Sequence, residues 1–309
     1  MTPDEAKLVA ERSEALWAAG RPQEGEALVR SALVRVGADS SGTRAVLELE
    51  LARYTAWTWP AEAFEGLRRA RDGARGSGDG ALLVRVFLES ARLSRRCFDV
   101  EDAREWGEAA VELARRLGEP ERVAQALGEL AETARVQGDH GRRVAVLRAR
   151  ADVEREESGD WWAWMHARTL DRLAQALAEL GDVAEEAAVV WEALGVFAGL
   201  PRDDADDRDW CVYAMVCVRA AELFGAPERS LRRAVGAWRA ALELDRLADG
   251  AHQNLAFALV RLAREHRPTD ALDLLDEAHR VVRQLGENAP LDAELVELVE
   301  ALEVEGFGD

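Results

Sequence analysis

Apolar residues recur at three- and four-residue spacing along almost the whole chain, which is the pattern of amphipathic helices. The clearest series is Leu170, Leu173, Ala174, Leu177 and Leu180, whose members fall on one helical face. Glycine, proline and Gly-Asp signals interrupt this pattern at short intervals and indicate tight turns. We therefore expect an all-α protein in which helices are joined in pairs.

The turn signals repeat roughly every 40 residues, which indicates a repeat architecture. They lie at Gly20, Pro60, Phe98, Gly138, Gly181, Gly225 and Pro268. We expect one domain over residues 1–309, with helical hairpins at 3–36, 43–72, 80–117, 121–157, 163–199, 208–246 and 251–285 and a capping helix at 291–305. The glycine-rich segment from Gly73 to Gly80 is expected to be a mobile connection.

Short motifs within the hairpins carry a family resemblance. First helices hold Leu-Ala pairs, turns hold Gly-Asp, and second helices hold an alanine, large apolar, alanine series: Leu51-Ala52, Leu130-Ala131, Leu173-Ala174 and Leu255-Ala256; Gly138-Asp139 and Gly181-Asp182; Ala63, Leu67 and Ala70; Ala234, Trp238 and Ala241; Ala271, Leu275 and Ala278. These motifs resemble the tetratricopeptide repeat (TPR) family over nearly the whole chain, although the units exceed the family's usual length of about 34 residues. Arg143 and Glu186 stand where that family prefers a small residue. The resemblance implies a right-handed α-solenoid that binds peptides or protein segments in a concave groove.

Charge and cysteine content narrow the possible partners and the compartment. The 309 residues include 40 basic and 59 acidic side chains, for a net charge of -19. Such a chain repels phosphate backbones, so we do not expect nucleic-acid binding. Three cysteines, Cys97, Cys211 and Cys217, argue against a disulfide framework and fit a reducing cytoplasm. No apolar run is long enough for a signal peptide or a membrane span.

The family's fold predicts which side chains enter the groove. There, the first helix of each hairpin lines the concave face, and the residue after its central small residue points inward. The residues at that position and one turn later include glutamates and alanines, and among them we single out five arginines and two aromatic residues as candidate groove residues: Arg53, Arg92, Arg95, Arg135, Arg219, Trp17 and Phe257. Clustered guanidinium groups hold carboxylates or phosphates, which favours an acidic partner segment or a small anion as ligand. The alternative is that these arginines pair with the protein's own surplus of glutamates.

Tryptophans form two further groups. Trp161, Trp162 and Trp164 begin the fifth hairpin and cannot all face one side of a helix. At least one is expected to be exposed, or covered by a partner or by a second copy in a homodimer. The alternative is packing against the preceding helix. Trp57 and Trp59 are expected to lie in the core.

Signals for catalysis are poor. The histidines are scattered, no cysteine pair has zinc spacing, and no glycine-rich phosphate loop follows a strand. The acidic run Asp203 to Asp209 lacks the pattern of a calcium loop and is interpreted as a solvated linker. We therefore expect no metal, no cofactor and no enzymatic activity. The leading function is a cytoplasmic interaction scaffold or adaptor that holds a partner segment. The alternative is a regulator that responds to a peptide or small anion and acts through a partner.

Overall fold

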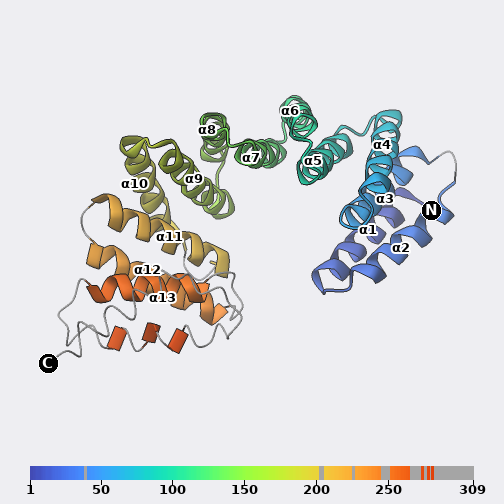
Figure 1. The fold of residues 1–309 in the computed structure, drawn as a ribbon. Helices are drawn as coiled ribbons and strands as arrows, with labels where there is room; N and C mark the ends of the chain where they lie inside the picture. The colour runs from blue at the N-terminus through green and yellow to red at the C-terminus, as the bar shows by residue number, and fades with distance from the viewer. Residues whose placement is uncertain are drawn as a thin grey trace. The chain divides into compact units, whose positions relative to one another are not determined.

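A computed structural model describes residues 1–37, 40–201, 205–224, 227–244 and 251–264, with positions 273–274, 277–278 and 280–281. Within these residues the chain forms thirteen α-helices and no strand (Figure 1). The prediction of an all-α repeat solenoid is therefore confirmed. The described helices are α1 (Pro3–Ala18), α2 (Pro22–Arg35), α3 (Ser41–Thr55), α4 (Pro60–Ser77), α5 (Gly80–Arg96), α6 (Val100–Leu117), α7 (Pro120–Gln137), α8 (His140–Glu156), α9 (Asp160–Leu180), α10 (Val183–Gly199), α11 (Asp207–Phe224), α12 (Pro227–Leu244) and α13 (Ala251–Arg264). The turn expected at Pro268 and the cap expected at 291–305 lie outside the described residues.

The turns are built by a short local signal. Gly138 ends α7 with φ of 70°, and Gly181 ends α9 with φ of 81°. Glycine adopts this left-handed conformation without a steric penalty. The aspartate that follows Gly181 then caps α10, because the Asp182 carboxylate accepts a hydrogen bond from the Glu185 amide at 3.1 Å. At the α5–α6 turn the same backbone conformation falls on Phe98, whose φ is 59° and whose side chain is 81% exposed.

The glycine-rich segment after residue 73 is helical, so its interpretation as a mobile connection was wrong. Helix α4 continues to Ser77, and only Gly78 and Asp79 separate it from α5. A methyl group on Gly73 would lie 2.8 Å from both the Ser41 carbonyl oxygen and the Ala45 Cβ of α3. This glycine therefore permits a close approach between α3 and α4.

Contacts between helices divide the chain into two compact units, Met1–Val153 and Glu154–Asp309. In the first unit, α1 contacts α3, α3 contacts α5 and α5 contacts α7, so the first helices of successive hairpins form one layer. The second helices α2 and α4 each pack against the next first helix as well as their own partner. Alanines such as Ala63, Ala70 and Ala110 are fully buried on the second helices. Small residues there let large apolar side chains of the first helices fill the space between the layers.

In the second unit, one core joins α11, α12 and α13. Trp238 of α12 is 2% exposed and packs with Cys217, Leu255 and Leu259. The three cysteines are free, and Cys217 is buried. None of the helices among the described residues combines the length and apolar content that crossing a bilayer requires.

Candidate functional site

The first-helix face of the first unit carries two adjoining hollows. The aromatic pocket, with a volume of about 390 Å³, lies at the C-terminal ends of α1, α3 and α5 and is marked by Trp17, Tyr54, Trp57 and Arg96. The charged hollow, of about 890 Å³, extends toward the N-terminal ends of α1 and α5 and reaches α7. Both hollows are lined by Glu14, Glu50, Arg53, Glu89 and Arg92. A continuous surface therefore follows these four helices.

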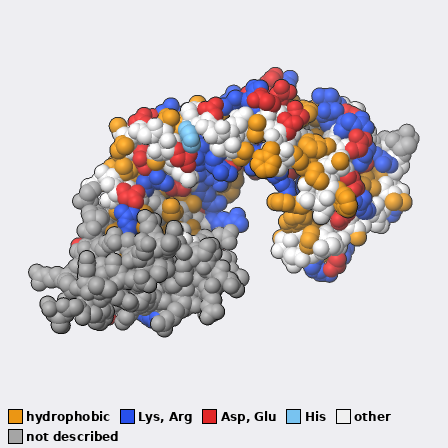
Figure 2. All heavy atoms as spheres, viewed as in Figure 1, with side chains coloured by type: hydrophobic (Ala, Val, Ile, Leu, Met, Phe, Trp, Pro, Cys, Tyr) orange, Lys and Arg blue, Asp and Glu red, His pale blue; other side chains and the backbone are white. Residues whose placement is uncertain are grey.

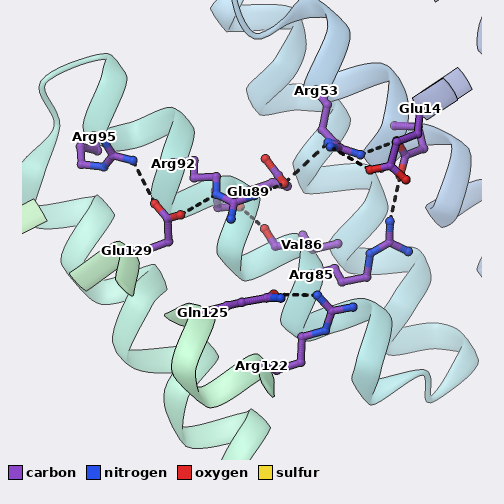
Figure 3. A network of polar contacts seen from close by, with 12 residues as sticks. Glu14, Arg53, Arg85, Val86, Glu89, Arg92, Arg95, Arg122, Gln125 and Glu129 are labelled. Carbon is purple, nitrogen blue, oxygen red and sulfur yellow. Dashed lines mark hydrogen bonds and ion pairs between the residues drawn. The ribbon is translucent and has the colours of Figure 1, made fainter. Parts of the chain in front are cut away.

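An ion-pair network lies between the two hollows (Figure 3). Arg53 contacts carboxylates from three helices: Glu14 of α1 at 3.6 Å, Glu50 of its own helix at 2.9 Å and Glu89 of α5 at 3.7 Å. The Glu50 carboxylate also accepts a hydrogen bond from Arg85 of α5 at 2.8 Å. Arg53 therefore links α1, α3 and α5.

The network continues from α5 to α7. Arg92 contacts Glu89 and Glu129, both at 2.7 Å, and Arg95 contacts the second oxygen of Glu129 at 2.9 Å. The eight side chains of the whole network comprise four arginines and four glutamates, so it carries no net charge. Figure 2 likewise shows acidic and basic side chains interspersed on the face in view.

Some carboxylates of the network are buried, which distinguishes their ion pairs from exposed pairs on the surface. The Glu50 side chain is 3% exposed, and burial raises its pKa although Arg53 and Arg85 favour the carboxylate form. Desolvation acts to lower the pKa of Arg53, but Glu50 and Glu89 outweigh it and the pKa is raised. Removing either partner of such a pair leaves a charge without compensation, which costs more than an exposed pair contributes. The pairs made by Glu50 and Glu129, whose side chains are 3% and 13% exposed, are therefore a fixed part of one wall on this face, whereas Glu14 is 67% exposed.

Aromatic side chains form the other wall. The Tyr54 hydroxyl donates a hydrogen bond to the Ser13 carbonyl oxygen at 2.6 Å, which fixes the phenol ring between α1 and α3. The Trp17 ring lies 5.2 Å from that ring. Trp57 and Trp59 are 70% and 66% exposed, so their predicted place in the core was wrong. The reason is local: α3 ends at Thr55, and both residues lie in the turn beyond its buried face.

Arg96 is distinct among the pocket's arginines. Its guanidinium lies 3.3 Å from the centroid of the Trp57 ring. In the part of the chain that the structure describes, no carboxylate lies within ion-pair distance of it, and its buried Nη2 atom has no hydrogen-bond partner. Desolvation by burial lowers the pKa of Arg96. The aromatic pocket thus contains one cation that is stacked but not ion-paired.

The structure brings together part of the predicted groove set. Trp17, Arg53 and Arg92 line the aromatic pocket, and Arg95 joins them through Glu129. Arg135 lies on α7, pairs with Glu132 at 2.9 Å and lines neither hollow. Arg219 pairs with Glu186 at 3.1 Å in the second unit, where Phe257 packs on the α11–α13 core. All five predicted arginines therefore have glutamate partners, the arrangement that the alternative interpretation described.

Three of the four residues that mark the pocket, Tyr54, Trp57 and Arg96, were missed by the sequence reasoning. Trp57 was assigned to the core, and Arg96 was not selected because the assumed register chose Arg95, three residues after Arg92. The spacing of four between Arg92 and Arg96 is equally compatible with one helical face, so this signal was available. Arg96 also belongs to the last turn of α5, where a positive charge is stabilised by the helix dipole.

The tryptophan cluster of the fifth hairpin is divided between exposed and packed positions. Trp161 is 52% exposed, as expected for at least one of the three, and its ring lies 4.6 Å from that of Trp162. Trp164 contacts Phe197 of α10, with ring centroids 5.7 Å apart. An interface role for this cluster stays a prediction.

The acidic run before α11 is in part structural. The Asp206 carboxylate accepts a hydrogen bond from the Asp209 amide at 2.8 Å, and the Asp209 carboxylate accepts one from the Asp206 amide at 3.2 Å. The two bonds form a reciprocal cap at the helix start. Arg168 of α9 contacts both carboxylates, and Asp209 is 4% exposed. The solvated-linker interpretation was therefore wrong for Asp209, whereas the Asp206 side chain is 53% exposed, and residues 202–204 lie outside the description. No group of three or more histidine, cysteine or acidic side chains among the described residues could hold a metal ion.

Comparison with known proteins identifies the fold. No family model matches the chain, and no curated protein matches it. The structure is similar to that of a signal-transduction ATPase with numerous domains and a tetratricopeptide repeat sensor from Pyrococcus horikoshii, with a TM-score of 0.69, 14% identity and coverage of 97% of this chain. This chain spans only 44% of that protein.

Two other solved structures are similar to this chain over nearly their whole length. The apo form of RapI has a TM-score of 0.58 and 10% identity, with 96% of this chain and 99% of that chain covered. The TPR-like repeats of a putative kinesin light chain from Podosopora anserina have a TM-score of 0.54 and 18% identity, with 65% of this chain and 99% of that chain covered. The fold is thus a TPR-like helical-repeat solenoid.

Proposed function

We propose that the first unit is an interaction module that holds a segment of another protein along the first-helix face of α1, α3, α5 and α7. The observation that carries this proposal is the pair of adjoining hollows on that face, with volumes of about 390 and 890 Å³. Both fall within the size range of ordinary ligand pockets, about 300–1,000 Å³. Together they offer an elongated surface rather than one enclosed cavity.

The chemistry of the lining suits a polypeptide backbone. A peptide presents alternating N–H donors and C=O acceptors. The network offers both kinds of partner, because guanidinium groups donate and carboxylates accept hydrogen bonds. The ion pairs fix these groups before binding, and preorganised groups lose less entropy when a ligand arrives. The exposed rings of Trp17 and Trp57 add the aromatic contacts on which binding hot spots rely.

Site-specific photo-crosslinking tests the proposal. A photoreactive phenylalanine analogue replaces Ala81 in the charged hollow or Ala18 in the aromatic pocket, both of which are exposed. The matched control position is Ala61, which is exposed in the first turn of the second helix α4. After irradiation in cells that produce the protein, the crosslinked peptides are sequenced by mass spectrometry.

We expect the two groove positions to capture the same partner and neighbouring residues of one segment, while Ala61 does not. Capture of that partner with equal yield at Ala61 would contradict groove binding. Absence of any specific product at both groove positions would reject the proposal.

A second candidate function is a ligand-responsive regulator that acts through a partner. It is favoured by the likeness to a protein whose tetratricopeptide repeats are described as a sensor, at a TM-score of 0.69. Hydrogen exchange with and without the captured segment separates the two functions. Protection confined to the first unit supports a scaffold, whereas altered exchange in α9–α12 as well supports a regulator.

A further inference from the structure

We infer that the aromatic pocket recognises a carboxylate next to an apolar side chain in the partner segment, with Arg96 binding the carboxylate. This inference rests on the proposed function and assigns it a ligand chemistry. Arg96 was not among the arginines expected in the groove. The argument depends on three properties of the pocket: its single unpaired cation, its aromatic walls and the charge of its rim.

The unpaired cation is the starting point. Arg53 and Arg92 direct their guanidinium groups at glutamates of the protein itself, so a ligand carboxylate would compete with those glutamates. Arg96 has only the π face of Trp57 as a described partner, and its buried Nη2 atom makes no hydrogen bond. The other guanidinium N–H groups of Arg96 are not fully buried, so a ligand carboxylate can accept charge-assisted hydrogen bonds from them without displacing a glutamate of the protein.

The aromatic walls supply the apolar part of the site. The Trp17 and Tyr54 rings lie 5.2 Å apart, and the hydrogen bond from Tyr54 to Ser13 fixes the second ring. Trp57 is held by Arg96 yet remains 70% exposed. Exposed indole rings around a pocket are an apolar surface that a partner's side chain can cover.

The charge of the rim selects the kind of anion. Three glutamates, Glu14, Glu50 and Glu89, line the same pocket. The ion-pair network that contains them is neutral, so Arg96 adds a single positive charge, which one carboxylate balances better than a doubly charged phosphate. The pocket therefore favours one carboxylate close to one apolar side chain.

Fluorine NMR on the full chain labelled with 5-fluorotryptophan provides the test. The chain has ten tryptophans, so the Trp17 and Trp57 signals are assigned with the variants Trp17→Phe and Trp57→Phe. The probes are hexapeptides blocked at both ends with the central pairs Leu-Glu, Leu-Gln, Leu-Lys or Ser-Glu. Two further peptides end in leucine, one with a free C-terminal carboxylate and one with a C-terminal amide. They distinguish recognition of a terminal carboxylate from recognition of a side-chain carboxylate.

We expect a carboxylate probe with leucine, either Leu-Glu or free C-terminal leucine, to shift both assigned signals saturably. Its neutral counterpart should bind about tenfold more weakly or worse, as is typical when a hydrogen bond to a charged group is lost. Ser-Glu should also bind more weakly than Leu-Glu. Arg96→Gln should abolish the preference for the carboxylate, and Arg96→Lys should retain part of it.

One control variant and one stability measurement accompany the test. Arg104→Gln removes an arginine of α6 that pairs with Glu101 and should leave the preference unchanged. Thermal unfolding of Arg96→Gln shows whether the variant folds. A purely structural Arg96–Trp57 contact would lower stability but leave the ratio of Leu-Glu to Leu-Gln affinity intact, and that result would overturn the inference.

Several other outcomes also overturn it. They are equal binding of Leu-Glu and Leu-Gln, tighter binding of Leu-Lys, or no shift at millimolar probe concentrations. Failure of the inference differs from failure of the proposed function. If the groove crosslinks persist while the probes show no preference, only the ligand assignment fails. If the probes bind as expected but no groove crosslink forms, the pocket stands and the interaction module does not.

Discussion

Ion pairing determines which arginines on the first-helix face are available to bind a ligand. The arginines that the sequence places in the groove are committed to glutamates, so their number overstates the positive charge open to a ligand. Arg96 is the exception within the aromatic pocket, because Trp57 rather than a carboxylate holds it. The same competition between burial and pairing operates at Asp171 of α9 in the second unit.

Replacing Asp171 should change how stability depends on pH. Burial raises the pKa of this carboxyl group from 3.8 to about 6, and Arg219 and Arg172 oppose that effect only in part. Because the folded state holds the proton more tightly than the unfolded state, the resulting stabilisation is complete below the unfolded pKa and is lost as pH rises through about 6. The asparagine of the Asp171→Asn variant stays neutral at every pH. The free energy of unfolding of this variant should therefore exceed that of the wild type by up to about 3 kcal/mol at pH above about 7.

Denaturant titrations of both proteins between acidic and neutral pH measure this effect. The difference in free energy of unfolding should shrink steadily on acidification and vanish near pH 4. A difference that is the same at every pH would show that the substitution acts through packing or hydrogen bonding, because the Asp171 Oδ1 atom is buried without a described partner.

At the scale of single helices, the residue that a position tolerates depends on how closely the neighbouring helix approaches it. In α4 two glycines of the same helix meet different surroundings. A methyl group on Gly73 would lie 2.8 Å from the backbone of α3, whereas one on Gly76 would have only the Ser41 Oγ within reach, at 3.8 Å. One glycine is therefore required by packing and the other is not.

Alanine substitutions at these two positions should differ in their effect on stability. Gly73→Ala introduces a clash with backbone atoms and should lower the free energy of unfolding by about 1–3 kcal/mol. Gly76→Ala, the matched control, should leave it unchanged or raise it by up to about 1 kcal/mol through helix propensity. Urea unfolding followed by circular dichroism measures both. Equal effects at the two positions would mean that α3 and α4 are not packed as described.

The molecule consists of helical hairpins, and within each unit these pack chiefly on their neighbours. Its contacts cluster into two units, and the apolar cores reflect this division: one cluster joins α3, α4 and α5, and another joins α11, α12 and α13. In such an architecture stability is close to a sum of local terms and nearest-neighbour contacts. Damage at one hairpin should therefore remain local.

Hydrogen exchange of the Gly73→Ala variant tests this expectation. Amides of α3, α4 and α5 should exchange faster than in the wild type, because local opening becomes less costly. Amides of α11 and α12 should exchange at unchanged rates. Equal acceleration in both units would instead identify a single cooperative folding unit and contradict the nearest-neighbour description.

The helical hairpins could be predicted from the sequence because their signals are local. Gly181 and Asp182 end one helix and start the next through their own backbone and side chain, and three- and four-residue spacing marks the buried face of α9. The signal misled where a residue's role depends on another element. Gly73 was assigned to a loop, although α3 is the reason that a glycine stands there. Trp57 was assigned to the core on its hydrophobicity, although the end of α3 places it outside.

The sequence by itself determined the all-α repeat fold and most of the turns, because helix periodicity and capping act within a few residues. Only the tertiary structure decided which arginine of the aromatic pocket has no carboxylate partner among the described residues. Arg53 contacts Glu14 and Glu89, and Arg92 and Arg95 contact Glu129, although the residues of each pair are more than thirty positions apart in sequence. Ion pairing depends on distances of a few ångströms between side chains, and helix packing sets those distances.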